Sequence, residues 1–189
     1  MSLLIIGIIA WSLAHLFPAV FSGTRAKLKN TLGEAPYRGL FSLLILVALL
    51  LIVFGWKSAV PSVLYAPPLS AGPVISGLIL IGFVLFFASP VDGNIKRFIR
   101  HPQMVGTLFW AVAHLLTNGD SRSVALFGGL AVWAILEVVM INRRDGAWQK
   151  PGQAAVKRDI VSVVIGLAAF ALVFYLHSRL FGVSPAPIQ

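Results

Sequence analysis

Long apolar stretches alternate with short polar ones along the whole chain. Each apolar stretch has roughly 16–23 residues, against the ~20 that a helix needs to cross the hydrocarbon core of a bilayer. Backbone groups in lipid must be hydrogen bonded within their own segment, which favours helices. The pattern predicts an all-α, polytopic membrane helix bundle with about six transmembrane helices, in a single integral membrane domain over residues 1–189. The predicted helices are 3–21, 40–56, 73–89, 103–118, 124–142 and 159–181.

The composition indicates a lipid environment and excludes several kinds of cofactor. Hydrophobic residues make up 58% of the chain and charged residues 11%, so the expected surroundings are a lipid bilayer. The net charge is +9, but the basic residues stand in short runs between apolar stretches, which indicates topology signals and no nucleic-acid partner. The absence of cysteine excludes disulfides, iron–sulfur clusters, thiolate haem ligands and covalent haem attachment.

The distribution of Lys and Arg predicts an orientation. Twelve of the fifteen basic residues lie in the first, third and fifth connections between the predicted helices, and Lys57, Arg122 and Arg179 lie on the other side. On the positive-inside rule, the three basic connections face the cytoplasm. The chain is therefore expected to be a multi-pass membrane protein with both termini on the outer side.

Two of the four histidines share a local motif. Residues 11–16 and 110–115 both read Trp-x-x-Ala-His-Leu, which places Trp11 beside His15 and Trp110 beside His114 on one helix face, with a small Ala that permits close approach. Ionisable side chains within a membrane helix are costly and usually mark a site. Each motif is interpreted as half of a pocket, and an inverted three-plus-three repeat would produce such a pair.

Depth along the predicted helices indicates which histidines can meet. At ~1.5 Å per residue, His15 lies ~9 Å and His114 ~16 Å from the cytoplasmic ends of their helices, a difference within the error of helix bounds. His101 is ~20 Å from His114 on the same helix, and His177 lies ~27 Å from the cytoplasmic end of the last helix, near the outer interface. His15 and His114 are therefore the expected metal ligands, and the alternative is a polar contact between packed helices.

A haem would need the two imidazoles, an apolar slot and basic groups for its propionates. Arg97, Arg100 and His101 lie at the cytoplasmic entrance of the helix that bears His114. Glu137 lies near the expected depth of His15 and is a candidate to hold a ligand imidazole's N–H. Its alternatives are an internal hydrogen bond or a contact with the headgroups.

The chain resembles the NnrU family of bacterial membrane proteins, whose plant relative is the plastid zeta-carotene isomerase. The resemblance rests on Arg-His-Pro-Gln-Met-Val-Gly at 100–106, Trp-Ala-Val-Ala-His-Leu at 110–115 and Ala14-His15. It implies a haem b site with histidine ligation at His15 and His114. It also implies a link to denitrification, through nitric oxide and nitrite reductases, or an isomerase-like reaction on an apolar substrate. The ligand would be an apolar or gaseous small molecule.

The chain departs from the isomerase motif at one position, and two other functions are also considered. The isomerase has a cysteine where this chain has Ala111, so a role for that cysteine is absent here. Arg100-His101-Pro102 with Gly106 also resembles isoprenylcysteine carboxyl methyltransferases, which bind S-adenosylmethionine, but Val138 follows Glu137 where those enzymes have a second glutamate. A third hypothesis is a non-catalytic assembly or regulatory partner of a membrane reductase.

Overall fold

The computed structural model describes residues 1–69 and 72–185, and it is helical. Within these ranges no strand forms, and Val63 and Asp120 make an isolated β-bridge. The all-α prediction is confirmed; residues 70–71 and 186–189 of the expected domain lie outside the described residues. The helices are α1 Ser2–Val20, α2 Ser22–Leu32, α3 Glu34–Ser58, α4 Pro73–Ala88, the 3-10 helix η1 Asn94–Arg97, α5 Pro102–Thr117, α6 Ser121–Ser123, the π-helical turn η2 Val124–Gly128, α7 Gly129–Asp145 and α8 Val156–Phe181.

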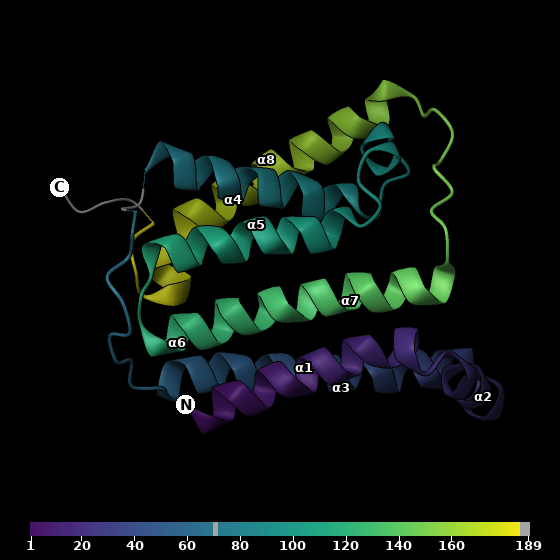
Figure 1. The fold of residues 1–189 in the computed structure, drawn as a ribbon, viewed down its shortest axis with the longest axis horizontal. Coiled ribbons are helices and arrows are strands. Elements are labelled where there is room, and N and C mark those ends of the chain that lie inside the picture. Colours follow the sequence, from purple (N-terminus) through teal and green to yellow (C-terminus); the bar gives the residue numbers. More distant parts are fainter. Residues whose placement is uncertain (70–71, 186–189) are drawn as a thin grey trace. The chain divides into compact units, whose positions relative to one another are not determined.

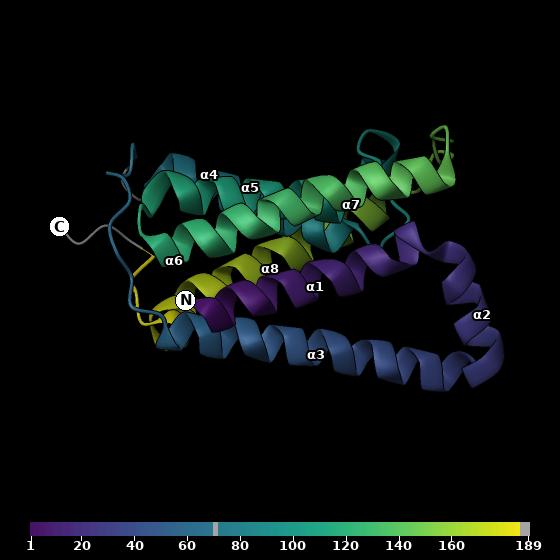
Figure 2. The same ribbon diagram turned by 60° about the horizontal axis from the view of Figure 1, so that its bottom comes forward.

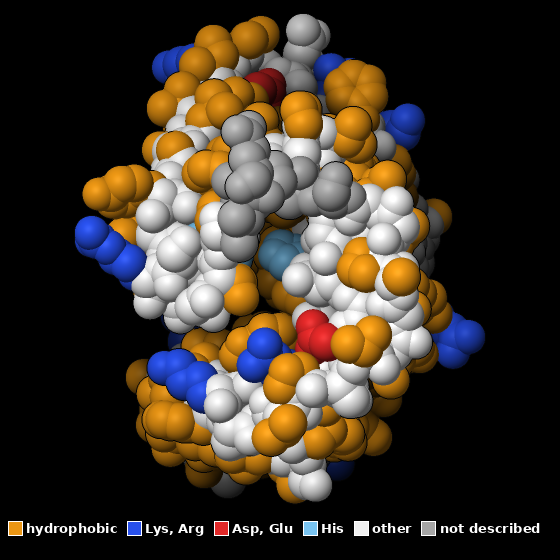
Figure 3. Space-filling model, turned by 90° about the vertical axis from the view of Figure 1, so that its left-hand side faces the viewer, with side chains coloured by type: hydrophobic (Ala, Val, Ile, Leu, Met, Phe, Trp, Pro, Cys, Tyr) orange, Lys and Arg blue, Asp and Glu red, His pale blue; other side chains and the backbone are white. Residues whose placement is uncertain are grey.

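Four helices are long and apolar enough to cross a membrane: α1, α3, the continuous helix Ser121–Asp145 and α8. The protein is therefore membrane-embedded. Helices α4 and α5 have 16 residues each, so six crossings are not established by length. Large hydrophobic side chains are exposed along the helices, including Leu13 at 64% and Val74 at 70%. Hydrophobic side chains, coloured orange, are also exposed on the end face that Figure 3 shows.

Each of the six predicted segments falls on a helix, and the proline and glycine signals explain several bounds. Pro102 is the first residue of α5, one residue before the predicted start, and Pro73 is the first residue of α4; proline suits this position because the first N–H groups of a helix have no partner within the helix. Helix α3 begins six residues before the predicted 40. Helix α2 was predicted as a connection, and it ends at Gly33, whose φ of 88° turns the chain into α3.

The helices form two compact units. Unit 1 comprises Met1–Tyr65 and Asp120–Ala147, and unit 2 comprises Ala66–Gly119 and Trp148–Gln189. The main helices of unit 1 are α1, α3 and α7, and those of unit 2 are α4, α5 and α8 (Figure 1). The two units therefore do not consist of the first three and the last three of these six helices in chain order. The single membrane domain stays a prediction.

Close contacts at glycines set the packing inside unit 1. A side chain at Gly7, early in α1, would place its Cβ 2.6 Å from the backbone nitrogen of Ile52, late in α3, so these helices are antiparallel and in backbone contact. A Cβ at Gly129 would meet Ile8 Cγ2 at 2.8 Å, which places the start of α7 beside the start of α1. Small residues at such crossings are typical of membrane helices.

Close contacts at glycines also set the packing inside unit 2. A Cβ at Gly82 of α4 would lie 2.9 Å from the carbonyl oxygen of Gly106 on α5, and a Cβ at Gly106 would lie 2.5 Å from the carbonyl oxygen of Gly82. On the other side of α4, a Cβ at Gly166 of α8 would lie 2.7 Å from Val84 Cα. Helix α4 is therefore the central helix of unit 2 and has α5 and α8 against it.

Basic residues gather at one end of each unit. In unit 1 this end comprises α2, the start of α3 and the end of α7; in unit 2 it comprises η1 and the starts of α5 and α8. Lys57, Arg122 and Arg179 lie toward the opposite ends. The twelve residues at the basic ends are Arg25, Lys27, Lys29, Arg38, Arg143 and Arg144 in unit 1, and Lys96, Arg97, Arg100, Lys150, Lys157 and Arg158 in unit 2.

Candidate functional site

His15 lies on α1 in an aromatic cluster of unit 1. Its ring centroid is 4.2 Å from that of Trp11, 5.1 Å from that of Trp133 on α7 and 6.2 Å from that of Phe41 on α3. Trp11 and His15 therefore share a helix face, as the motif predicted. Trp133 and Phe41 were not predicted, and three helices thus hold the imidazole of His15.

A backbone hydrogen bond orients the imidazole of His15. Its Nδ1 lies 2.9 Å from the carbonyl oxygen of Trp11. A carbonyl oxygen only accepts, so Nδ1 carries the hydrogen and Nε2 keeps the lone pair that binds metals. The Trp11 carbonyl thus has the role that Glu137 was expected to have, since it holds the imidazole N–H.

His114 repeats this geometry in unit 2. Its Nδ1 lies 2.8 Å from the carbonyl oxygen of Trp110, and the two ring centroids are 5.1 Å apart. The carbonyl of His114 accepts hydrogen bonds from Asn118, through Nδ2 at 2.9 Å and the backbone N–H at 2.8 Å. The second motif therefore also places the hydrogen on Nδ1 and the lone pair on Nε2.

Buried polar atoms accumulate in unit 1 around α1 and α7. Trp11 Nε1, Trp133 Nε1 and Glu137 Oε2 have no hydrogen-bond partner within residues 1–69 and 72–185. The exposed fraction is 5% for Trp133 and 9% for Glu137, which lie four residues apart on one face of α7. A buried polar atom without a partner costs about 1–3 kcal/mol, and the interaction of Trp133 with Glu137 offsets part of this cost.

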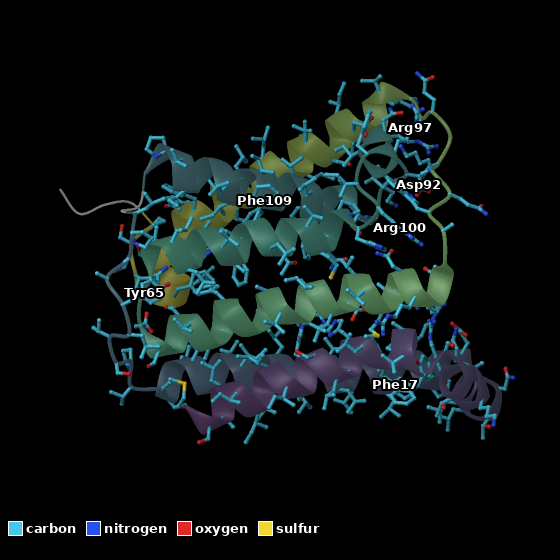
Figure 4. The ribbon with its side chains drawn as sticks, in the orientation of Figure 1. Phe17, Tyr65, Asp92, Arg97, Arg100 and Phe109 are labelled. Atoms are coloured by element: carbon cyan, nitrogen blue, oxygen red, sulfur yellow. The ribbon has the colours of Figure 1, made fainter. Side chains whose placement is uncertain are left out.

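The predicted propionate-binding residues lie at the basic end of unit 2. His101 directly precedes α5, and Figure 4 shows Arg97 and Arg100 near Asp92, where α4 has ended. Lys96 donates to Asp92 at 3.0 Å, and this bond holds the pKa of that carboxyl below its usual value. The role of Arg97, Arg100 and His101 in binding propionates stays a prediction.

His177 lies near the C-terminal end of α8 in unit 2, close enough to His114 for the charges of the two side chains to interact. Its Nδ1 is 2.8 Å from the carbonyl oxygen of Val183, which follows the helix, and its ring packs 4.9 Å from that of Phe181. That His177 is not an axial ligand stays a prediction.

The metal prediction also raises the question of whether possible metal ligands cluster in the structure. No group of three or more His, Cys, Asp or Glu that could hold a metal ion occurs in the part of the chain that the structure describes. A haem needs only two axial histidines. His15 belongs to unit 1 and His114 to unit 2, so their pairing stays a prediction.

Comparison with known proteins gives one match. The family model described as NnrU protein matches residues 3–185, nearly the whole chain. No curated protein and no solved structure matches it.

Proposed function

The chain belongs to the NnrU family, and on that premise we propose that it is a membrane haem b protein with His15 and His114 as axial ligands. Its activity would lie in denitrification or nitric oxide metabolism, or in an isomerase-like reaction on an apolar substrate. The observation that carries the proposal is the repeated geometry of the two motifs. In both, the backbone carbonyl of the Trp binds Nδ1 and leaves Nε2 as the ligating nitrogen.

The residues of the chain fit this cofactor in charge and in donor chemistry. Haem iron, when bound, supplies redox chemistry and a site for a small gaseous ligand. Trp11 and Trp110 would flank the two imidazoles and restrict their rotation, since each indole packs against its histidine. Arg97, Arg100 and His101 would neutralise carboxylates at the basic end, and Glu137 would supply a polar group in the apolar interior of unit 1.

The proposal includes six membrane crossings with both termini in the periplasm. Helices α4 and α5 are ~24 Å long at ~1.5 Å per residue, shorter than the ~30 Å hydrocarbon core, and would need their flanking residues or a locally thinner bilayer to cross. The basic ends of both units would face the cytoplasm of a bacterial inner membrane. Because the chain has no cysteine, single cysteines at Ser2, Ser58, Gly23 and Gly152 would report the topology, since a side chain at either glycine meets no neighbouring atom. Only the first two should react with an impermeant maleimide from the periplasm.

The test of the haem claim is the absorption spectrum of the protein purified from haem-replete cells. We expect a Soret band with low-spin features and one haem per chain by pyridine haemochrome assay. His15→Ala and His114→Ala should each lose or shift this spectrum, and His177→Ala, the control, should not. A colourless preparation that remains folded, as judged by circular dichroism and a single size-exclusion peak, would contradict the proposal.

The same preparation distinguishes the two rival functions. An S-adenosylmethionine-dependent methyltransferase would bind that cofactor in calorimetry, and the binding would depend on Arg100 and His101. A non-catalytic partner would purify without chromophore together with a membrane reductase. Either result, with no haem, would replace the proposed function.

A further inference from the structure

Helix α2 has no role in the haem proposal and differs from every other long helix of the chain. It has 11 residues, which span ~16 Å and cannot cross a bilayer. It connects α1 to α3, two helices that are long enough to cross. Figure 2 shows α2 running across the ends of these two helices. The connection therefore places α2 at the level of the membrane surface.

The sequence of α2 has an apolar stripe. At 100° per residue, Leu28 and Leu32 fall within about 40° of one another on one face, which Phe21, the residue directly before the helix, extends; Asn30 falls on the opposite face. The three apolar side chains are exposed, by 55%, 37% and 44% respectively. Exposed apolar residues on one face of a short helix at the surface are typical of a helix that lies in the membrane interface.

The charge of α2 is entirely positive, and part of it is not neutralised by the protein. Glu34 binds Lys29 at 2.8 Å and Arg38 at 2.9 Å, so it accounts for two cations. Arg25 Nε is buried without a hydrogen-bond partner, and Lys27 is exposed and has no ion pair among the described residues. No acidic residue occurs between 21 and 33. Two cations therefore remain beside the apolar stripe.

We propose that α2 is an interfacial helix that binds anionic phospholipid headgroups. Arg25 and Lys27 bind the phosphates, while Phe21, Leu28 and Leu32 enter the boundary between headgroups and acyl chains. Long basic side chains suit this position because their stems lie along apolar surface and their charges reach the headgroups. The proposal is independent of the haem, since α2 carries none of the haem-site residues.

The depth of α2 can be measured because any introduced cysteine is unique in this chain. Leu28→Cys and Asn30→Cys, each labelled with bimane, are reconstituted in nanodiscs of phosphatidylglycerol and phosphatidylcholine in equal amounts. Lipids brominated on the upper acyl chain should quench the probe at 28 strongly and the probe at 30 weakly. Equal quenching at both positions would show that α2 does not lie with this face in the bilayer and would overturn the proposal.

The choice of lipid is tested with the probe at 28 and one brominated lipid at a time. Each basic side chain near the surface contributes about 1 kcal/mol of attraction to an anionic membrane, so two should favour brominated phosphatidylglycerol over phosphatidylcholine by roughly thirtyfold. The double variant Arg25→Gln with Lys27→Gln should reduce this preference severalfold. Lys57→Gln with Arg179→Gln removes the same charge from the opposite ends of the units and should leave it unchanged. No preference in the parent protein, or an equal loss in both double variants, would contradict the proposal.

Discussion

The two Trp-x-x-Ala-His segments have the same local geometry in different surroundings. In both, Nδ1 of the histidine binds the carbonyl four residues earlier, at 2.9 Å for His15 and 2.8 Å for His114. Around His15, Trp133 and Phe41 come from two other helices. The motif of His114 lies in the last turns of α5, where Asn118 binds the histidine's carbonyl. The tautomer is thus set by each helix alone, whereas the environment of each ring depends on its unit.

The largest effect is expected from substitutions that disrupt the helix packing on which the surroundings of each histidine depend. Gly7→Leu in unit 1 and Gly106→Leu in unit 2 force a side chain against the backbone of the neighbouring helix. We expect each to lower the free energy of unfolding by about 3 kcal/mol or more, measured as thermal stability in detergent. Gly39→Leu and Gly77→Leu are matched controls, because no atom lies within 4 Å of a Cβ there. Equal stability of all four variants would contradict the packing described.

A smaller effect should be confined to unit 2. Asp159, in the first turn of α8, accepts hydrogen bonds from the Ile95 N–H at 3.1 Å and from Asn94 Nδ2 at 2.7 Å, and so binds η1 to α8. Asp159→Ala should lower the thermal stability measurably, since both bonds go to a carboxylate. Hydrogen exchange should become faster at residues 93–97. Faster exchange across α1 and α3 instead would show that the carboxylate does not act locally.

The corresponding carboxylate of unit 1 should matter less. Asp120 accepts hydrogen bonds from the backbone N–H groups of Arg122 and Ser123, both at 3.0 Å, and so caps the helix that continues into α7. Asp120→Ala should cost about 1 kcal/mol, as is usual for an N-cap. Asp120→Asn, which can still accept both bonds, should retain most of the stability. Equal losses in the two variants would mean that the cap does not explain the effect.

The smallest effect concerns the unpaired polar atoms near His15. Glu137→Gln keeps the shape of the side chain and removes a buried carboxylate whose Oε2 lacks a partner. We expect the thermal stability of the haem-free protein to be unchanged or higher, by about 1 kcal/mol at most. A clear loss of stability would contradict this expectation and would reveal a partner for this carboxylate.

Much of the fold follows from patterns that are local in sequence. The six apolar stretches predict the helices to within a few residues, apart from the earlier start of α3, because length and hydropathy determine what is stable in lipid. The shared face of Trp11 and His15 follows from helical periodicity. Helix α2 was missed because its apolar residues are only three among polar ones, so its hydropathy is that of a loop.

The parts of the site that depend on tertiary contacts could not be predicted. Trp133 and Phe41 reach His15 from α7 and α3, and nothing in a single sequence pairs those helices with α1. A weak signal existed in the spacing of Trp133 and Glu137, two polar-tipped side chains on one face of an apolar helix. The role of the Trp carbonyl was also missed, because a backbone acceptor leaves no mark on residue types.

The measurement that tests the account most directly is electron paramagnetic resonance of the oxidised protein with its haem. We predict a low-spin ferric signal in the parent protein, which is the signal expected if both proposed histidines ligate the haem iron. We also predict conversion to a high-spin signal, or loss of the haem, in His15→Ala and in His114→Ala alike. A low-spin signal that survives unchanged in either variant would contradict the ligation that we propose.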